Sequence, residues 1–311
     1  ARKIVTKTVC DYAEQNHNVN YLHVWLADAQ KNHCECENCR KKTPSDWYVM
    51  ALNEIDEELT ARGLDTRIVF CAYSDTTHAP TTEKIKNPAR FSLMLGAISR
   101  SYTYSVEKDP KVERITPFEL NKSGRLDTME EYIYHSNQWR KFAPCNSFAY
   151  EYHFWKHQFY APGVFSFAKR LQEDVLSYRD NGFNGMIQDG SQRAFFPNGF
   201  NYYVYANVLF DNDADFEELK KDYFSHAYGD QWETVVEYLE TIDRLMPQSY
   251  LECRHTAPVP PNFFKPEMEK GLLSVQEVCD KYDEIFKAHR NMPYRVQTVS
   301  MRLLTEHTHF C

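Results

Sequence analysis

The stretch that decides the fold is Val19-Asn-Tyr-Leu-His-Val-Trp-Leu-Ala-Asp28, followed directly by Ala29-Gln-Lys-Asn-His-Cys-Glu-Cys-Glu-Asn-Cys39. Its apolar first part predicts a buried β-strand that ends at the carboxylate of Asp28. Three cysteines then follow with the spacing Cys-x-Cys-x-x-Cys. Because α/β enzymes place their reactive groups at the carboxyl ends of strands, this stretch predicts one wall of an active site.

Similar segments alternate along the next part of the chain. Further strands are expected at residues 66–73, 91–97, 146–152 and 183–189. Apolar residues at helical spacing predict helices at residues 4–13, 44–63, 128–139 and 167–178. This alternation indicates a parallel α/β sheet with crossover helices, and the acids at strand ends favour a TIM-like barrel over an open sheet.

Five predicted strands are too few for a closed barrel, which has eight. We therefore expect either the C-terminal portion of a barrel, with further βα units and domains upstream, or a sheet that is open or closed differently. From residue 200 onward the pattern is helical, with a proline-rich loop at 247–266. The expected division is a βα-barrel portion with the active-site rim at 1–210 and a helical extension packed on it at 211–311.

Composition excludes several classes of function. The net charge of −8 is spread over interspersed acids and bases, which argues against a nucleic-acid partner. No apolar run is long enough to predict a membrane span. With 10 glycines and no Gly-rich phosphate loop, the chain predicts no organic cofactor. The chain begins at Ala1 without a leader, so the compartment stays open.

Three acids are the candidate catalytic residues: Asp28, Glu151 and Asp189. Each lies at or next to the carboxyl end of a predicted strand, and in a parallel barrel these ends share one rim. A pair of carboxyl groups, one protonated and one ionised, is what glycoside hydrolysis requires. The alternative for each acid alone is a loop cap or an ion pair.

Residues near the same strand ends are candidates for contact with a sugar, because aromatic faces and planar guanidinium groups suit sugar rings and carboxylates. The candidates are Tyr73, Arg100, Tyr102, Tyr152, His153 and Trp155. Arg100 could hold a uronic-acid group, or it could form a salt bridge to one of the acids. The residues that follow Glu151 could equally pack the loop.

Cys34, Cys36 and Cys39 offer three soft ligands for one structural zinc ion. The fourth ligand could be His33, Cys10 or Cys71. A local disulfide or free thiols are the alternatives. Nine cysteines, six of them scattered singly, are unlike a disulfide framework and favour reduced thiols.

Several motifs together resemble a known bacterial family, domain of unknown function four-eight-three-eight. They are Trp25-Leu-Ala-Asp28 followed by His33 to Cys39, then Ser45-Asp-Trp-Tyr48 with Asn53, Ile98 to Tyr102, Trp139 leading to Tyr150-Glu-Tyr152, and Gly182 to Gly185 followed by Tyr202 to Leu209. The resemblance covers about residues 5–245. It implies the second half of a carbohydrate-active barrel, similar to those of α-glucuronidases and β-hexosaminidases.

These observations lead to two main hypotheses. The first is a glycoside hydrolase that acts on a polysaccharide or oligosaccharide, which could contain uronic acids or amino sugars, by carboxylate acid/base catalysis. The second is a non-catalytic carbohydrate-binding or scaffolding domain of a larger polysaccharide-degrading protein. A metal-dependent regulatory or redox module built on the cysteines is a third.

Overall fold

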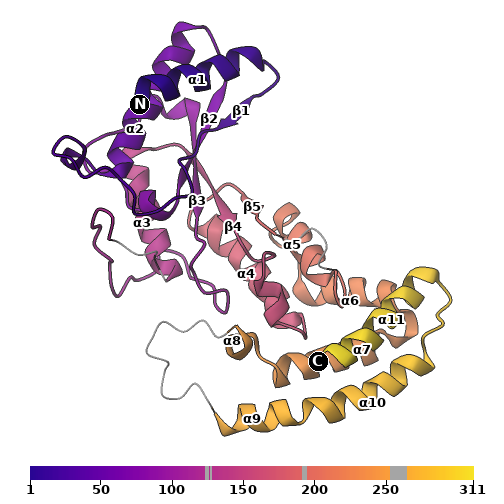
Figure 1. Ribbon diagram of the computed structural model, residues 1–311. Helices are drawn as coiled ribbons and strands as arrows, with labels where there is room; N and C mark the ends of the chain where they lie inside the picture. Colours follow the sequence, from indigo (N-terminus) through magenta and orange to yellow (C-terminus); the bar gives the residue numbers. More distant parts are fainter. Residues whose placement is uncertain (123–125, 127, 191–194, 253–264) are drawn as a thin grey trace. The chain divides into compact units, whose positions relative to one another are not determined.

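The computed structural model describes residues 1–122, 126, 128–190, 195–252 and 265–311 (Figure 1). The chain forms two compact units. Unit 1 consists of Ala1–Arg100, Val106–Glu151 and Tyr178–Ile187, and unit 2 consists of Ser101–Ser105, Tyr152–Ser177 and Gln188–Cys311. Each unit is built from separate segments of the chain, whereas the sequence pattern led us to expect one division at residue 210.

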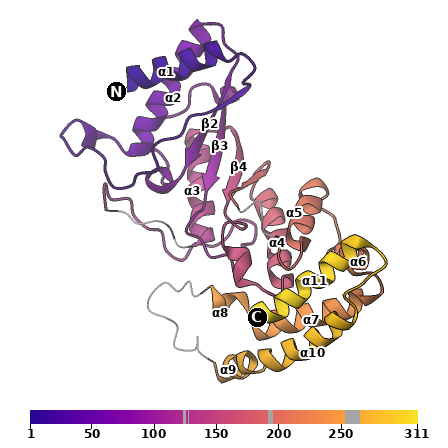
Figure 2. The same cartoon turned by 45° about the vertical axis from the view of Figure 1, so that its right-hand side comes forward.

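Unit 1 is built on a parallel sheet. The strands are β1 (Tyr21–His23), β2 (Arg67–Ala72), β3 (Phe91–Gly96), β4 (Asn146–Glu151) and β5 (Met186–Gln188), of which the last residue belongs to unit 2. Their order in the sheet is their order in the chain, and β2, β3 and β4 lie side by side in Figure 2. Strands added in one direction give a curled half-barrel rather than a doubly wound sheet. The α/β class is thus confirmed, and the described residues contain five strands that form a half-barrel surrounded by helices.

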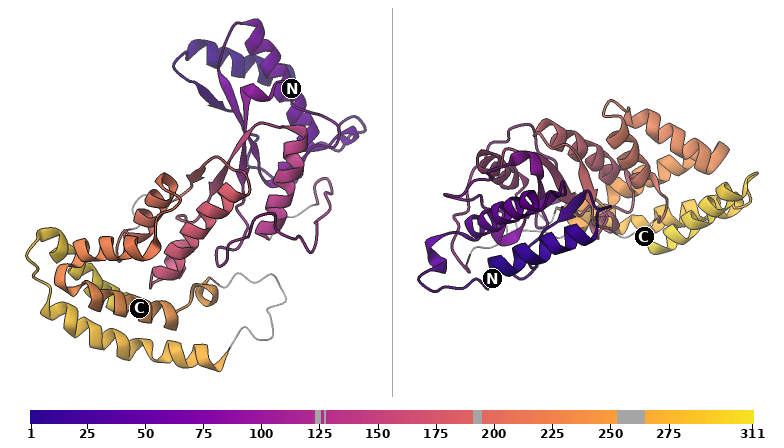
Figure 3. Two further views of the ribbon diagram at one scale, coloured as in Figure 1. Left: turned by 180° about the vertical axis from the view of Figure 1, so that it is seen from behind. Right: turned by 90° about the horizontal axis from the view of Figure 1, so that it is seen from above.

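The crossover helices of unit 1 cover one face of this sheet. They are α2 (Pro44–Ala61) and α3 (Met129–Phe142), and both reach Phe70 of β2. The Phe70 ring lies 6.0 Å from the ring of Tyr48 on α2 and 5.6 Å from that of Trp139 on α3, measured between centroids. The helix α1 (Arg2–Gln15) lies beside α2 (Figure 3). The predicted helix 44–63 is confirmed, and Gly63 follows it at φ 68°.

One expectation for the N-terminal part was wrong. The opening strand is short and exposed rather than buried, and Tyr21 is 49% exposed. The reason is its position at the end of the strand order, where only β2 pairs with it. The helix predicted at residues 4–13 is confirmed as α1, in which Cys10 and Ala13 are buried and Ile4 is 72% exposed.

Unit 2 is mainly helical, as expected for the C-terminal part of the chain. Its helices are α4 (Phe165–Asp180, of which the last three residues belong to unit 1), α5 (Phe200–Phe210), α6 (Phe216–Tyr228), α7 (Trp232–Leu245), α8 (Gln248–Leu251), α9 (Pro266–Leu273), α10 (Val275–Ala288) and α11 (Arg295–Phe310). The helices α9 and α10 are separated by Ser274. In the described ranges, no helix combines the length and hydropathy that crossing a membrane requires.

Asp46 joins the start of α2 to a neighbouring loop of unit 1. Its Oδ1 accepts hydrogen bonds from the backbone N–H groups of Thr81, Thr82 and Glu83 at 3.0, 2.9 and 2.9 Å. Its Oδ2 accepts from the hydroxyl groups of Thr43 and Thr81, each at 2.8 Å. Thr43 is the N-cap of α2, and it forms a capping box with Asp46. One fully buried carboxylate therefore satisfies donors from two segments.

These donors change the acidity of the group. Burial alone would raise the pKa of Asp46, but the hydrogen bonds from Glu83, Thr82, Thr81 and Thr43 outweigh it and hold the pKa well below its ordinary value. Because the pKa is lower in the folded state, the ionised carboxylate stabilises the fold above the unfolded pKa of about 3.9. This contribution is lost as the pH falls through the folded pKa.

We predict that Asp46→Ala lowers the free energy of unfolding by about 3 kcal/mol at pH 7, because it removes a helix cap and leaves buried donors without partners. The difference between the variant and the unsubstituted protein should be constant above about pH 5 and shrink below about pH 4. Urea unfolding followed by circular dichroism at several pH values measures both. Asp65→Asn, at an exposed position, is the control and should unfold like the unsubstituted protein. An equal loss at all pH values would contradict the role of the ionised carboxylate.

Candidate functional site

Glu151 is the last residue of β4, at the strand end where the sequence predicted it. Its carboxylate Oε1 lies 2.9 Å from Nε of Arg100 and accepts a hydrogen bond from the hydroxyl group of Tyr178. The side chains of Glu151 and Arg100 are both 0% exposed. The charge of each is therefore neutralised inside unit 1 by the other.

The burial of this ion pair affects the predicted roles of both residues, Arg100 as a sugar-contacting residue and Glu151 as a catalytic acid. Of the two possibilities for Arg100, the salt bridge to an acid is the one observed. Successive side chains of a strand point to opposite faces of the sheet, so Glu151 and Ser147 of β4 lie on the same face. Oγ of Ser147 lies 3.3 Å from Nη2 of Arg140 on α3. Glu151 thus points towards the helix-covered face, and its position favours a structural or positioning role over contact with a substrate.

The two other predicted acids lie in different units. The strand β1 ends at His23, earlier than expected, so Asp28 lies in the loop after the strand. Its side chain is exposed. Asp189 follows β5 directly and is partly buried in unit 2. Both carboxyl groups are at least partly accessible to solvent, in contrast to Glu151. Their assignment as catalytic residues stays a prediction.

Several predicted sugar-contacting residues form a buried network in unit 2. Tyr102 stacks on His157 with ring centroids 3.9 Å apart, and its ring lies 4.9 Å from that of His153. The hydroxyl oxygen of Tyr102 accepts a hydrogen bond from the backbone N–H of Tyr152 at 3.0 Å. Nε2 of His153 lies 2.7 Å from Oδ2 of Asp174. The buried positions of Tyr102, Tyr152 and His153 favour packing over sugar contact, while Trp155 is 47% exposed.

A set of aromatic side chains gathers on the other face of the sheet in unit 1. Alternation along the strands places Phe148 and Tyr150 of β4 on the face opposite the buried Phe70 face. The ring of Trp25, 46% exposed, meets the ring of Tyr150 edge-on with centroids 5.9 Å apart. We call Trp25, Tyr73, Phe148 and Tyr150 the aromatic face.

Tyr73 extends this face across the middle strand. It follows β2, and a Cβ at Gly96 of β3 would lie 2.9 Å from Cδ2 of the Tyr73 ring. Gly96 is the register partner of Tyr150 on β4. The absence of a side chain at Gly96 therefore lets the Tyr73 ring lie against β3, next to the strand that carries Tyr150. Trp25, Tyr73 and Tyr150 all lie at the carboxyl ends of the parallel strands.

The segment from Lys31 to Cys39, which we call the cysteine loop, brings three thiol groups together, as the sequence predicted. The sulfur atoms of Cys34, Cys36 and Cys39 all lie within 4.8 Å of one another, so the cluster could hold a metal ion. Among the described residues no fourth His, Cys, Asp or Glu joins the group. Two of the candidates for the fourth ligand lie elsewhere: Cys10 is buried in α1 and Cys71 in β2.

The thiols of the cluster differ in acidity. A hydrogen bond from the backbone of Cys39, together with the neighbouring thiols of Cys34 and Cys39, lowers the pKa of Cys36 to about 7. The thiols of Cys36 and Cys34 raise the pKa of Cys39 to about 11. The cluster therefore contains one thiol that ionises near neutral pH.

Asp75 and Asn121 hold the cysteine loop in place. Oδ2 of Asp75 accepts a hydrogen bond from the backbone N–H of Lys31 at 2.8 Å and lies 3.0 Å from Nε2 of His33. Oδ1 of Asn121 accepts from the backbone N–H of His33, and Nδ2 of Asn121 donates to the His33 carbonyl, both at 2.8 Å. The sequence analysis missed both residues, although Asp75, an acid just after a predicted strand, carried the same signal as the three acids it selected.

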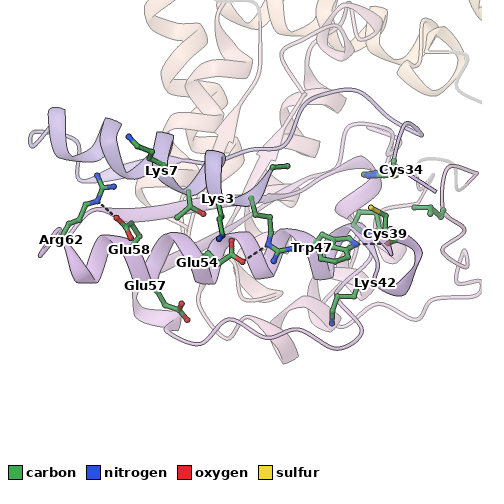
Figure 4. A pocket seen from close by; sticks show the side chains of 16 residues that line it. Lys3, Lys7, Cys34, Cys39, Lys42, Trp47, Glu54, Glu57, Glu58 and Arg62 are labelled. Carbon is green, nitrogen blue, oxygen red and sulfur yellow. Dashed lines mark hydrogen bonds and ion pairs between the residues drawn. The ribbon is translucent and has the colours of Figure 1, made fainter. Parts of the chain in front are cut away.

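A cavity of about 1190 Å³ opens between α1, α2 and the cysteine loop in unit 1. Figure 4 shows Cys34 and Cys39 at one end of it and Arg62 and Glu58 at the other. Trp47 lies between, and its indole N–H donates to the carbonyl oxygen of Cys39 at 3.0 Å. The cysteine cluster therefore borders a space large enough for a small molecule.

Comparison with known proteins identifies the family. No curated protein and no solved structure matches the chain. One family model, described as domain of unknown function DUF4838, matches residues 1–240 and so covers all of unit 1 and part of unit 2. The chain belongs to the DUF4838 family.

Proposed function

We propose that unit 1 binds carbohydrate on its aromatic face, as part of a glycoside hydrolase that acts on a polysaccharide or oligosaccharide. The observation that carries this proposal is the half-exposed Trp25 ring, held edge-on by Tyr150 at the carboxyl ends of parallel strands. The apolar faces of sugar rings pack on such aromatic rings, whose polar edges stay hydrated. The carboxyl ends of parallel strands are also where α/β barrels bind their substrates.

The burial of the acids limits how hydrolysis could proceed. A general acid or base must reach the glycosidic oxygen or the attacking water. Asp28 is exposed and lies three residues after Trp25 in the chain, so we assign it as the acid that contacts a sugar on the aromatic face. The Arg100–Glu151 pair is buried, so a preference for uronic acids has no support from Arg100.

Replacement of the central ring tests the binding proposal. Trp25→Ala should weaken the affinity for a bound oligosaccharide about tenfold, because it removes the stacking platform. Isothermal titration calorimetry with cello-, xylo-, chito- and galacturono-oligosaccharides measures this. Tyr294→Ala is the matched control, since Tyr294 is an exposed aromatic residue in unit 2, at the N-cap position of α11. Equal affinities of the two variants would contradict a role for the aromatic face.

A second comparison separates a catalytic acid from a structural one. We expect Asp28→Asn to lower kcat/KM for hydrolysis at least a hundredfold while leaving thermal unfolding unchanged. Glu151→Gln should instead lower the free energy of unfolding by about 3 kcal/mol, because it leaves the buried Arg100 without its counter-charge. Release of reducing sugar and calorimetric unfolding are the two measurements.

The same experiment decides between hydrolysis and binding alone. If Asp28→Asn has full activity, Asp28 is not catalytic. If the unsubstituted protein binds an oligosaccharide but releases no reducing sugar, the chain is a carbohydrate-binding domain and the hydrolase proposal fails. A carbohydrate-binding domain would still bind its ligand on the aromatic face, but it would need no pair of catalytic acids.

We also propose that Cys34, Cys36 and Cys39 bind one zinc ion. Thiolates are preferred ligands of Zn²⁺, and the lowered pKa of Cys36, about 7, makes it more ionised at neutral pH than an ordinary cysteine. The loop that carries the three thiols is already anchored by Asp75 and Asn121, so less ordering remains to be done when the ion binds. Bound zinc would stabilise the loop at the amino end of α2.

Metal analysis checks this proposal. The purified protein should contain about one zinc ion per chain, and Cys36→Ser should bind it at least tenfold more weakly, because one of three thiolate ligands is lost. Cys145→Ser, which removes a cysteine outside the cluster, should keep the metal. A metal-free protein that takes up no zinc on dialysis would disprove the site.

A further inference from the structure

Two cysteines of unit 2 that are distant in the chain lie at the same end of a helical hairpin. The helices α10 and α11 pack against each other and run in opposite directions (Figure 1). Near the open end of this hairpin, Oγ1 of Thr308 on α11 donates to Oδ1 of Asp283 on α10 at 3.3 Å. Cys279 lies one helical turn before Asp283, and Cys311 directly follows α11. The hairpin therefore brings the two cysteines together.

Tyr238 of α7 contacts both helices and shows which of their faces meet. Its ring lies 5.0 Å from the ring of Tyr282 and 5.1 Å from that of Phe286, both on α10, measured between centroids. Cys279 precedes these two residues by three and seven positions, so it lies on the same face of α10. The hydroxyl group of Tyr238 lies 2.9 Å from Nδ1 of His307 on α11.

The thiol groups of Cys279 and Cys311 meet beside this tyrosine. They are hydrogen-bonded to each other, and both interact with the hydroxyl group of Tyr238. Sγ of Cys311 also lies 3.5 Å from Nε2 of His307. Cys279 is 2% exposed, whereas Cys311 is partly exposed. One thiol of the pair is thus buried, and the other is accessible from solvent.

The two thiols differ in acidity. The hydrogen bond with Cys311 lowers the pKa of Cys279 and outweighs the effect of burial. The same hydrogen bond, together with burial, raises the pKa of Cys311. Because the thiolate is the nucleophile in thiol–disulfide exchange, Cys279 is the better nucleophile of the two towards a disulfide formed at Cys311.

We propose that Cys279 and Cys311 are a redox pair, which a small-molecule disulfide oxidises to an intramolecular disulfide bond between α10 and the end of α11. The proposal concerns unit 2 and does not depend on the proposed carbohydrate and zinc sites. Both cysteines are free thiols in the structure, which corresponds to the reduced form of the pair.

The oxidation proceeds in two exchanges. Cys311 first gives its proton to solvent, and its sulfur attacks the small disulfide, whose S–S bond breaks and releases one thiolate. Cys279 then attacks the sulfur of Cys311 as a thiolate, so that the mixed disulfide breaks and the second small thiolate leaves. The two released thiolates take up the protons that the cysteines lost. Two cysteine thiols are thus oxidised, and one small disulfide is reduced to two thiols.

Incubation of the folded protein with oxidised glutathione tests the inference. After alkylation in denaturant and digestion with trypsin, mass spectrometry should find peptide 271–281, with Cys279, linked to peptide 303–311, with Cys311. The glutathione adduct of Cys311 should not accumulate, because the second exchange is intramolecular and uses the more acidic thiol. Cys145→Ser, which removes a cysteine outside the pair, should give the same linked peptides. If glutathione stays bound to Cys311, or if both peptides are recovered singly and alkylated, the inference is wrong.

Thermal unfolding gives a second readout. The disulfide bond closes the loop from residue 279 to residue 311 and lowers the entropy of the unfolded chain, so oxidation should raise the Tm by roughly 5 °C. Cys279→Ser and Cys311→Ser should show no such rise. Each variant is compared with its own reduced form, so that a loss of stability caused by the substitution itself cancels. The cysteine loop of unit 1 meets the same oxidant in every sample. An equal rise in Cys311→Ser would therefore assign the effect to other thiols and overturn the inference.

Discussion

The parallel strands have the same order in the sheet as in the chain, and this order constrains the fold of unit 1 more than any single contact does. In unit 1, the helices α2 and α3 belong to connections between parallel strands, and both pack against the same face of the sheet. Phe70 shows the result, because it meets both Tyr48 of α2 and Trp139 of α3. The carboxyl ends of the strands consequently share one edge in unit 1, and the aromatic face is left on the side opposite these helices.

Two buried carboxylates show how this architecture tolerates charge. Asp46 is surrounded by backbone N–H groups and hydroxyl groups, and Glu151 is paired with Arg100. In both, the desolvation of the charge is offset by hydrogen bonds or an opposite charge. An acid at the end of a strand is therefore not by itself a catalytic acid. Its exposure and its partners decide which role it has, and in unit 1 they favour Asp28 for contact with a ligand.

Along the chain of unit 1, the cysteine loop carries the thiols proposed to bind zinc and follows residues proposed to bind carbohydrate. It begins just after Trp25 and Asp28, and it is braced by Asp75 at the end of the neighbouring strand. The carbonyl of Cys39 accepts a hydrogen bond from Trp47 on α2, so the loop is also tied to a helix that covers the sheet. A metal bound by the three thiols would stiffen this loop and, with it, the segment that carries Asp28.

The sequence by itself determined the alternation of strands and helices, the clustering of three cysteines and the position of Glu151 at a strand end, because these follow from local periodicity and spacing. Local spacing carries no information on which neighbour a side chain meets. Only the tertiary structure decided that β1 is an exposed edge strand, that Arg100 neutralises Glu151, and that Asp75 and Asn121 hold the cysteine loop. Those contacts join residues far apart in the chain, and burial and pairing at such distances arise only when the sheet has assembled.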